Sequence, residues 1–198
     1  MAEPVEWFRP TSGRVLGVVG LVAAVLVLGT AVRYWRDDSS ISIALGALFG
    51  GVLIWAAMLR PRVGVTPTTL VLRNMLETVH LPLAAVEELA LRQMLAVRAG
   101  DKRYVSPALG RSWRSLVRSS FTQPKAETGG GTQAVPDYPT FVESRIRQLV
   151  DDARATAGVK RGSAEQLALA DATRREPAWL EIGLLAVTGV ALVLSIAF

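Results

Sequence analysis

Three long stretches of the chain carry no charged side chain, and they constrain its fold more than any other feature. They cover Val15–Val32, Ile41–Leu59 and Ile182–Phe198. As helices, these stretches would be about long enough to cross the roughly 30 Å hydrocarbon core of a bilayer. A soluble protein of 198 residues could not surround such helices with its own side chains. The sequence therefore predicts a membrane protein, with a transmembrane helical hairpin over residues 15–59 and a third transmembrane helix over residues 179–198.

The apolar stretches near the two ends of the chain can each be interpreted in a second way. A buried core helix is the alternative for every stretch, and it has most weight for the third, which follows Glu181 closely. We expect Glu181 at headgroup level, without a charged partner. Arg9 and Arg14 before the first stretch resemble the start of a secretion signal, but the apolar run is too long for one and no clear cleavage motif precedes Arg33. We therefore expect a retained helix.

The distribution of basic residues predicts the orientation. The segment Arg60–Pro177 holds all of the 22 Lys and Arg residues except Arg9, Arg14, Arg33 and Arg36. Cytoplasmic segments near membrane helices carry an excess of Lys and Arg. We therefore expect a multi-pass protein of the inner (plasma) membrane, with the N-terminus and the central segment in the cytoplasm and the C-terminus outside.

The central segment predicts a small α+β domain. Short β-prone runs alternate with turn residues up to Val105, although Leu83–Leu95 also fits a helical stripe. A helix is predicted around Phe141–Ala153, with one apolar face, and a second from Ser163, where a capping-box pattern begins. The expected divisions are a cytoplasmic flank (1–14), the hairpin (15–59), a domain (60–157) with a mobile loop (119–139), a helical connector (158–178) and the last helix (179–198).

The runs Pro61–Thr66, Leu70–Asn74 and Val79–Leu89, placed after a membrane hairpin, resemble membrane-anchored bacterial pleckstrin-homology-like proteins of the actinobacterial type. The resemblance covers about Pro61–Ala155. It implies a seven-stranded, partly open β-barrel in the cytoplasm, closed by a C-terminal capping helix. It also implies binding or scaffolding rather than catalysis, and phosphoinositide binding is not carried over. The third transmembrane helix departs from the simplest two-helix architecture of the family.

Residues that could carry catalysis or bind a metal are scarce in this sequence. The chain has no cysteine and one histidine, His80. The adjacent acidic pairs Glu87-Glu88 and Asp151-Asp152 would point in different directions on a helix, so neither pair is expected to hold a cation. The run Gly129–Gly131 lacks the lysine of a phosphate-binding loop. We therefore expect no enzyme activity, no cofactor and no metal site.

A run of basic residues is the strongest candidate for a binding site. It comprises Arg92, Arg98, Lys102, Arg103, Arg111, Arg114 and Arg118. A tethered domain would hold such a patch near protein partners or near anionic lipid headgroups, each basic group contributing about 1 kcal/mol at such a surface. A merely solvated surface is an equal alternative, and nucleic-acid binding is not expected.

A second candidate lies in the hairpin. Gly46, Gly50 and Gly51 form a face that lets helices approach closely, either within this hairpin or against a larger membrane complex. Together these features predict a non-enzymatic interaction or scaffold protein, or an accessory or assembly subunit of an inner-membrane complex. The alternatives are an anionic-lipid sensor and a component of a membrane enzyme or transporter, which would need polar groups within the bilayer.

Overall fold

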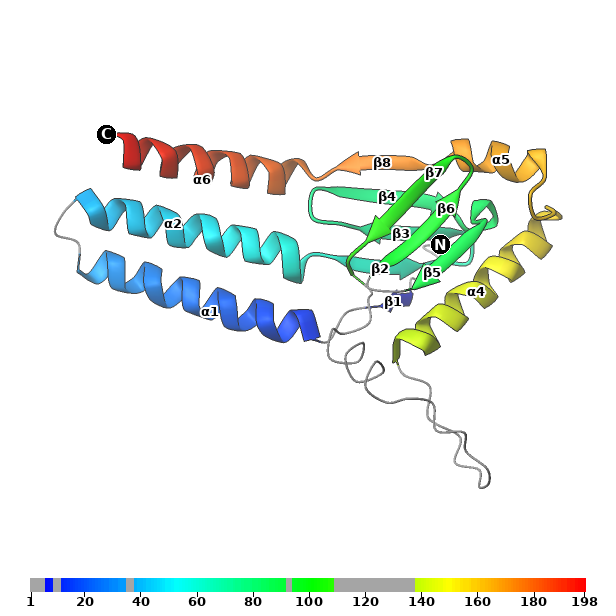
Figure 1. Cartoon of the computed structure of the whole chain (residues 1–198), viewed down its shortest axis with the longest axis horizontal. Coiled ribbons are helices and arrows are strands. Elements are labelled where there is room, and N and C mark those ends of the chain that lie inside the picture. The colour runs from blue at the N-terminus through cyan, green and yellow to red at the C-terminus, as the bar shows by residue number, and fades with distance from the viewer. Residues whose placement is uncertain (1–5, 9–11, 35–37, 92–93, 109–137) are drawn as a thin grey trace, which may run out of the picture. The chain divides into compact units, whose positions relative to one another are not determined.

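The computed structural model describes residues 6–8, 12–34, 38–91, 94–108 and 138–198. The chain divides into two compact units. The first comprises residues 1–9, 62–72 and 79–174, and the second comprises residues 10–61, 73–78 and 175–198. Strands occupy mainly the first unit and long helices the second, so the fold class is α+β (Figure 1).

The second unit contains the three apolar helices that the sequence predicts. They are α1 (Ser12–Arg33), α2 (Asp38–Ile54), which continues as a π-helical turn over Trp55–Leu59, and α6 (Trp179–Ala197). All three are long and apolar enough to cross a membrane. Only 11% of the most apolar window of each helix is buried within the protein, so most of its hydrophobic side chains face outward. Exposed apolar surface on this scale is stable in lipid rather than in water.

Helix α2 lies between the other two helices of this unit. It contacts α1 along one side and α6 along the other (Figure 1). The α1 contact is close because Gly17 faces Met58 and Leu59, and Gly20 faces Ile54. A Cβ atom at Gly17 would lie 3.0 Å from the Cβ of Met58, so a side chain there would push the helices apart. Glycine thus sets the spacing of the hairpin.

The strands form two sheets. The first has the order β1 (Glu6–Phe8), β2 (Arg62–Val65), β3 (Thr69–Arg73), β4 (Glu77–Pro82), β8 (Arg174–Pro177). The second has the order β5 (Glu88–Leu91), β6 (Leu95–Ala99), β7 (Lys102–Ser106), and its pairs are antiparallel. The described residues thus contain an open antiparallel arrangement of eight short strands.

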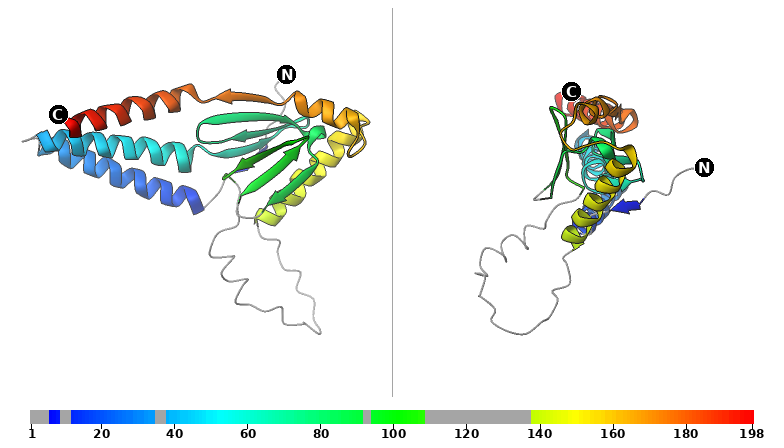
Figure 2. Two further views of the ribbon diagram at one scale, coloured as in Figure 1. Left: turned by 45° about the horizontal axis from the view of Figure 1, so that its top comes forward. Right: turned by 90° about the vertical axis from the view of Figure 1, so that its right-hand side faces the viewer.

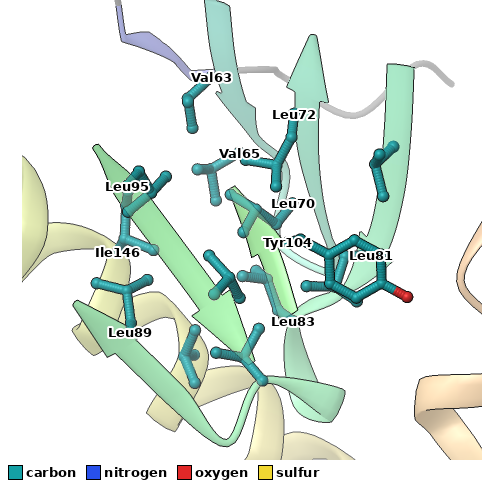
Figure 3. Packing of buried hydrophobic residues seen from close by; sticks show 14 of the residues in the cluster. Val63, Val65, Leu70, Leu72, Leu81, Leu83, Leu89, Leu95, Tyr104 and Ile146 are labelled. Carbon is teal, nitrogen blue, oxygen red and sulfur yellow. The ribbon is translucent and has the colours of Figure 1, made fainter. Parts of the chain in front are cut away.

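Alternating side chains build the core of the first unit. In β3, Leu70 and Leu72 are fully buried, whereas their neighbours are partly exposed, and β6 repeats the pattern at Leu95 and Val97. Because successive side chains of a strand point to opposite faces, this alternation puts one face of each strand in the core. Figure 3 shows the side chains of both sheets meeting there, with Ile146 of helix α4 among them.

Helix α4 (Tyr138–Ala157) covers β5 in this unit (Figure 2). Its buried residues are Val142, Ile146 and Val150, spaced four apart. The apolar face predicted from the sequence also included Phe141, but Phe141 is 53% exposed, so that part of the prediction was wrong. Leu149 and Ala153, also of the predicted face, are partly buried and pack against the core.

Helix α5 (Ala164–Asp171) begins where the capping-box pattern predicts. The Ser163 side chain accepts a hydrogen bond from the Gln166 backbone N–H, which satisfies one free donor of the first turn. Gln166 is fully buried, and its amide nitrogen donates to the carbonyl oxygens of Ala84 and Val86. This buried amide ties α5 to the chain that leads into β5.

The N-terminal flank and the connector before α6 differ from the sequence expectations. The N-terminal flank contains strand β1, which pairs with β2, and Glu6 of that strand accepts a hydrogen bond from Arg145 of α4 at 3.1 Å. This bond and the negative charge of Glu6 raise the pKa of Arg145.

The expected helical connector contains α5 followed by strand β8. In the run Leu83–Leu95, for which strand and helix were both open, the described residues contain a 3-10 turn (Leu83–Ala85), strand β5 and the first residue of β6. The expected mobile loop lies almost wholly outside the described residues.

Candidate functional site

The outward face of β5, β6 and β7 forms the strongest candidate binding surface. Strand pairing places Glu88 opposite Arg98, and Arg98 opposite Arg103, in one row across the sheet. The next outward row contains Ala90 and Ala96. A hollow of about 440 Å³ is lined by Glu88, Ala90, Met94, Ala96, Arg98 and Arg103. We call this the β5–β7 hollow.

The hollow combines a small apolar floor with cationic walls. Arg98 is partly engaged, since its Nε donates to the Gly100 carbonyl at 3.4 Å and lies 3.6 Å from the Glu87 carboxylate. Arg103 and Lys102 are exposed and have no acidic partner within the described part of the chain. Their charges are therefore available to a binding partner, whereas half of the Arg98 side chain is still open to solvent.

Two lining residues of the hollow, Arg98 and Arg103, belong to the basic patch that the sequence predicts, and Lys102 lies next to them in the chain but outside the lining. Arg98, Lys102 and Arg103 lie together on the β6–β7 hairpin, where Ala99 pairs with Lys102. The other four predicted members lie outside the described residues, and they are Arg92, Arg111, Arg114 and Arg118. The three that are described gather because a tight turn at Gly100, with φ of +57°, folds β7 back on β6. A residue with a side chain rarely adopts that conformation.

Three arginines that the sequence reasoning did not single out contact the outer edge of β5. Arg154 donates to the Val86 carbonyl at 2.6 Å, Arg161 to the Glu87 carbonyl at 3.0 Å and Arg147 to the Leu89 carbonyl at 2.9 Å. Two carboxylates hold the guanidinium groups in place, Glu143 for Arg147 and Asp151 for Arg154. The seven-residue spacing of the arginines is the signal that could have drawn attention to them, because it keeps Arg147 and Arg154 on one side of α4.

A buried ion pair lies in the second unit. The Arg60 side chain, at the end of the α2 segment, donates through Nε to the Glu181 carboxylate in the first turn of α6. Its NH1 group donates to the carbonyl oxygens of Asn74 and Met75. Both side chains are over 90% buried. The expectation that Glu181 has no charged partner was therefore wrong.

The three glycines predicted as a helix-packing face point in different directions. A Cβ atom added at Gly46 would lie 3.8 Å from the Leu192 side chain of α6, and one added at Gly51 would lie 3.5 Å from the Cβ of Ala24 in α1. Gly50 has open space beside it. Gly46 and Gly51 thus serve packing within this unit, and Gly50 alone of the three faces no neighbour among the described residues.

The structure was also compared with known proteins. No family model, curated protein or solved structure matches this chain. Its chemistry must therefore be inferred from its own residues. In the described ranges no three His, Cys, Asp or Glu side chains gather as metal ligands would. The β5–β7 hollow presents hydrogen-bond donors, positive charge and a small apolar surface. These groups can bind a partner.

Proposed function

We propose that this chain is a non-enzymatic, membrane-anchored interaction protein, acting as an accessory or assembly subunit of an inner-membrane complex. In this proposal α1, α2 and α6 cross the membrane, the first unit lies in the cytoplasm, and Phe198 lies outside. The β5–β7 hollow binds an acidic segment of a protein partner. The observation that carries the proposal is that the exposed Arg103 lines the hollow beside its apolar floor, with no acidic partner among the residues that the structure describes.

The arrangement of the first unit supports a pleckstrin-homology-like fold within this proposal. Of six consecutive strands, β2 to β4 belong to the first sheet and β5 to β7 form the second, and helix α4 follows them and packs on the second sheet. The sequence resemblance implies seven strands followed by a helix, so this run of six described strands has one strand fewer than implied and the same final helix. Strands β1 and β8 are additions that extend the first sheet at its two edges.

Charge favours a protein partner over an anionic bilayer. Glu88 lies in the same row as Arg98 and Arg103, and it forms no ion pair with another described residue. A continuous anionic surface would bring negative charge against this carboxylate, which costs free energy. A peptide can place acidic groups at the arginines and a neutral or basic group at Glu88. Mixed charge in one small hollow therefore suits a segment with its own sequence.

Anchoring explains how a small hollow could be sufficient. A contact between exposed charges contributes little by itself, typically below about 1 kcal/mol for each pair. Two proteins confined to one membrane meet at a high effective concentration, so a weak contact can hold them together. The anchor would then supply most of the affinity and the hollow most of the specificity.

Site-directed photocrosslinking in native membranes tests the proposal. A benzoylphenylalanine at Met94, which is half exposed at the hollow, would react with whatever fills it. We expect protein adducts whose crosslinked peptide is acidic. Arg103→Glu should remove them, and Lys160→Glu, at an exposed site elsewhere, should leave them unchanged. Adducts with lipid alone, or adducts that survive Arg103→Glu, would overturn it in favour of lipid binding or of no specific function for the hollow.

A further inference from the structure

The first unit contains a second hollow, distinct from the first and mainly apolar. It lies between helices α4 and α5, over the chain where β2 turns into β3 and where β4 ends. Its volume is about 500 Å³, and its apolar walls include Pro67, Pro82, Leu149, Ala153 and Leu169. We call it the α4–α5 groove. A volume between about 300 and 1,000 Å³ with apolar walls is typical of binding sites.

The walls of the groove are firmly supported. Leu149, Ala153 and Leu169 are partly buried and pack against the main hydrophobic core. The floor includes Ala84, in the 3-10 turn that contacts both helices. The buried Gln166 amide, bonded to the carbonyl oxygens of Ala84 and Val86, fixes α5 over this turn. The groove is thus formed before a ligand arrives, which lowers the entropic cost of binding.

Asp152 is the only charged residue that lines the groove in the described structure. The Asp152 side chain is exposed and forms neither a hydrogen bond nor an ion pair with another described residue, although its charge also acts on Arg145 of the same helix. Thr156 also lines the groove, but its hydroxyl donates to the Asp152 backbone carbonyl at 2.9 Å. The groove therefore presents an apolar surface with one negative charge at its side.

We infer that the α4–α5 groove binds an amphipathic helical segment of a protein partner, with apolar side chains in the groove and a Lys or Arg against Asp152. The volume suits more than one apolar side chain, as a helix presents at positions i and i+3 or i+4. The exposed carboxylate disfavours an acidic segment or an anionic lipid. This inference rests on the proposed function as an interaction protein, but it concerns a different surface and a partner segment of opposite charge.

Selection of peptides on the full chain in lipid nanodiscs tests the inference. A random phage library of short peptides is panned on the chain after removal of phage that bind empty nanodiscs. The selected peptides are synthesised, and their affinity is measured by fluorescence anisotropy. We expect sequences in which Leu, Ile or Phe recurs at helical spacing beside Lys or Arg.

Matched variants assign the binding to the groove. Ala153→Trp fills the groove and should weaken the selected peptides at least about tenfold, as loss of a central contact does. Ala155→Trp, exposed on the same helix but outside the groove, should change affinity by less than about twofold. Asp152→Lys, at an exposed position that tolerates charge, should also weaken binding about threefold to fivefold, as the loss of an exposed charge pair does, and it keeps the test valid if Ala153→Trp unfolds the unit.

Two outcomes would overturn the inference. One is that no peptide is selected, or that the selected peptides bind Ala153→Trp and Asp152→Lys as tightly as the parent chain. The other is a set of acidic peptides that lose affinity with Arg103→Glu alone, which would support the β5–β7 hollow and leave the groove without a role. Failure of the groove and failure of the proposed function are thus separated by which variant removes binding.

Discussion

Arg60 and Glu181 are 121 positions apart in the chain and form a buried ion pair. The same guanidinium group also holds the carbonyl oxygens of Asn74 and Met75, in the turn between β3 and β4. One side chain therefore joins the end of the α2 segment, the first turn of α6 and this turn. The contact fixes where α6 begins relative to the other two segments of the second unit.

Glu181→Gln should destabilise the second unit because it leaves the Arg60 charge buried without its counter-ion. Removing one member of a buried pair costs about 3–5 kcal/mol. We expect a clear fall in the midpoint of thermal unfolding of the full chain in nanodiscs. The double variant Arg60→Leu/Glu181→Leu should regain part of the loss, since it buries no lone charge. A double variant less stable than either single one would show that the pair is not the cause.

Gln166→Leu should loosen α5, because the buried Ala84 carbonyl oxygen loses its side-chain donor and the Gly162 N–H loses the Gln166 side-chain oxygen as its acceptor, whereas the Val86 carbonyl oxygen keeps Arg154. An unsatisfied buried polar group costs about 1–3 kcal/mol. Hydrogen–deuterium exchange should show faster exchange at Gly162 and in α5. Gln148→Leu, at an exposed position of α4, is the matched control and should leave this exchange unchanged.

Gly100→Ala should cost more than Gly158→Ala, although both glycines adopt positive φ, of 57° and 66°. The added methyl group at position 100 would lie 3.3 Å from the Ala170 Cβ, whereas at position 158 it meets open space. Backbone strain of about 1–2 kcal/mol is common to both. The difference between their free energies of unfolding, measured in urea, reports the contact with Ala170. Equal losses would contradict the close packing of α5 on this turn.

The orientation predicted from the basic residues can be tested with single cysteines, because the chain contains none of its own. Phe198→Cys should react with a membrane-impermeant maleimide in intact spheroplasts, since we expect the C-terminus outside. Ala155→Cys, at an exposed position of the first unit, should react only after lysis. Labelling of Ala155→Cys before lysis would reverse the proposed topology and with it the cytoplasmic location of both hollows.

Much of the local structure could be predicted from the sequence, because its causes are local. Charge-free stretches predicted α1, α2 and α6, and the pattern at Ser163 predicted the start of α5. Strand β1 was missed because Glu6–Phe8 is too short to show alternation, and β8 was missed because Arg174–Pro177 is mostly polar. Both are strands only because a neighbouring strand pairs with them, which a local pattern does not reveal.

The candidate sites were harder to predict, since side chains from distant segments form them. The gathering of Arg98, Lys102 and Arg103 followed from their closeness in sequence. The Arg60–Glu181 pair did not, because two charges at the ends of separate apolar stretches give no signal of contact. The α4–α5 groove depends on how the two helices meet the turn at Ala84, and no single stretch of sequence specifies that meeting.

The arginines along β5 have a consequence for contacts between copies of the chain. An exposed strand edge invites pairing with an identical strand, which leads to aggregation. Here the backbone oxygens of Val86, Glu87 and Leu89 are already occupied by Arg154, Arg161 and Arg147. Another strand that bonded to these three carbonyl oxygens would first have to displace the guanidinium groups. The three arginines therefore make this edge less available for pairing with a strand of another copy.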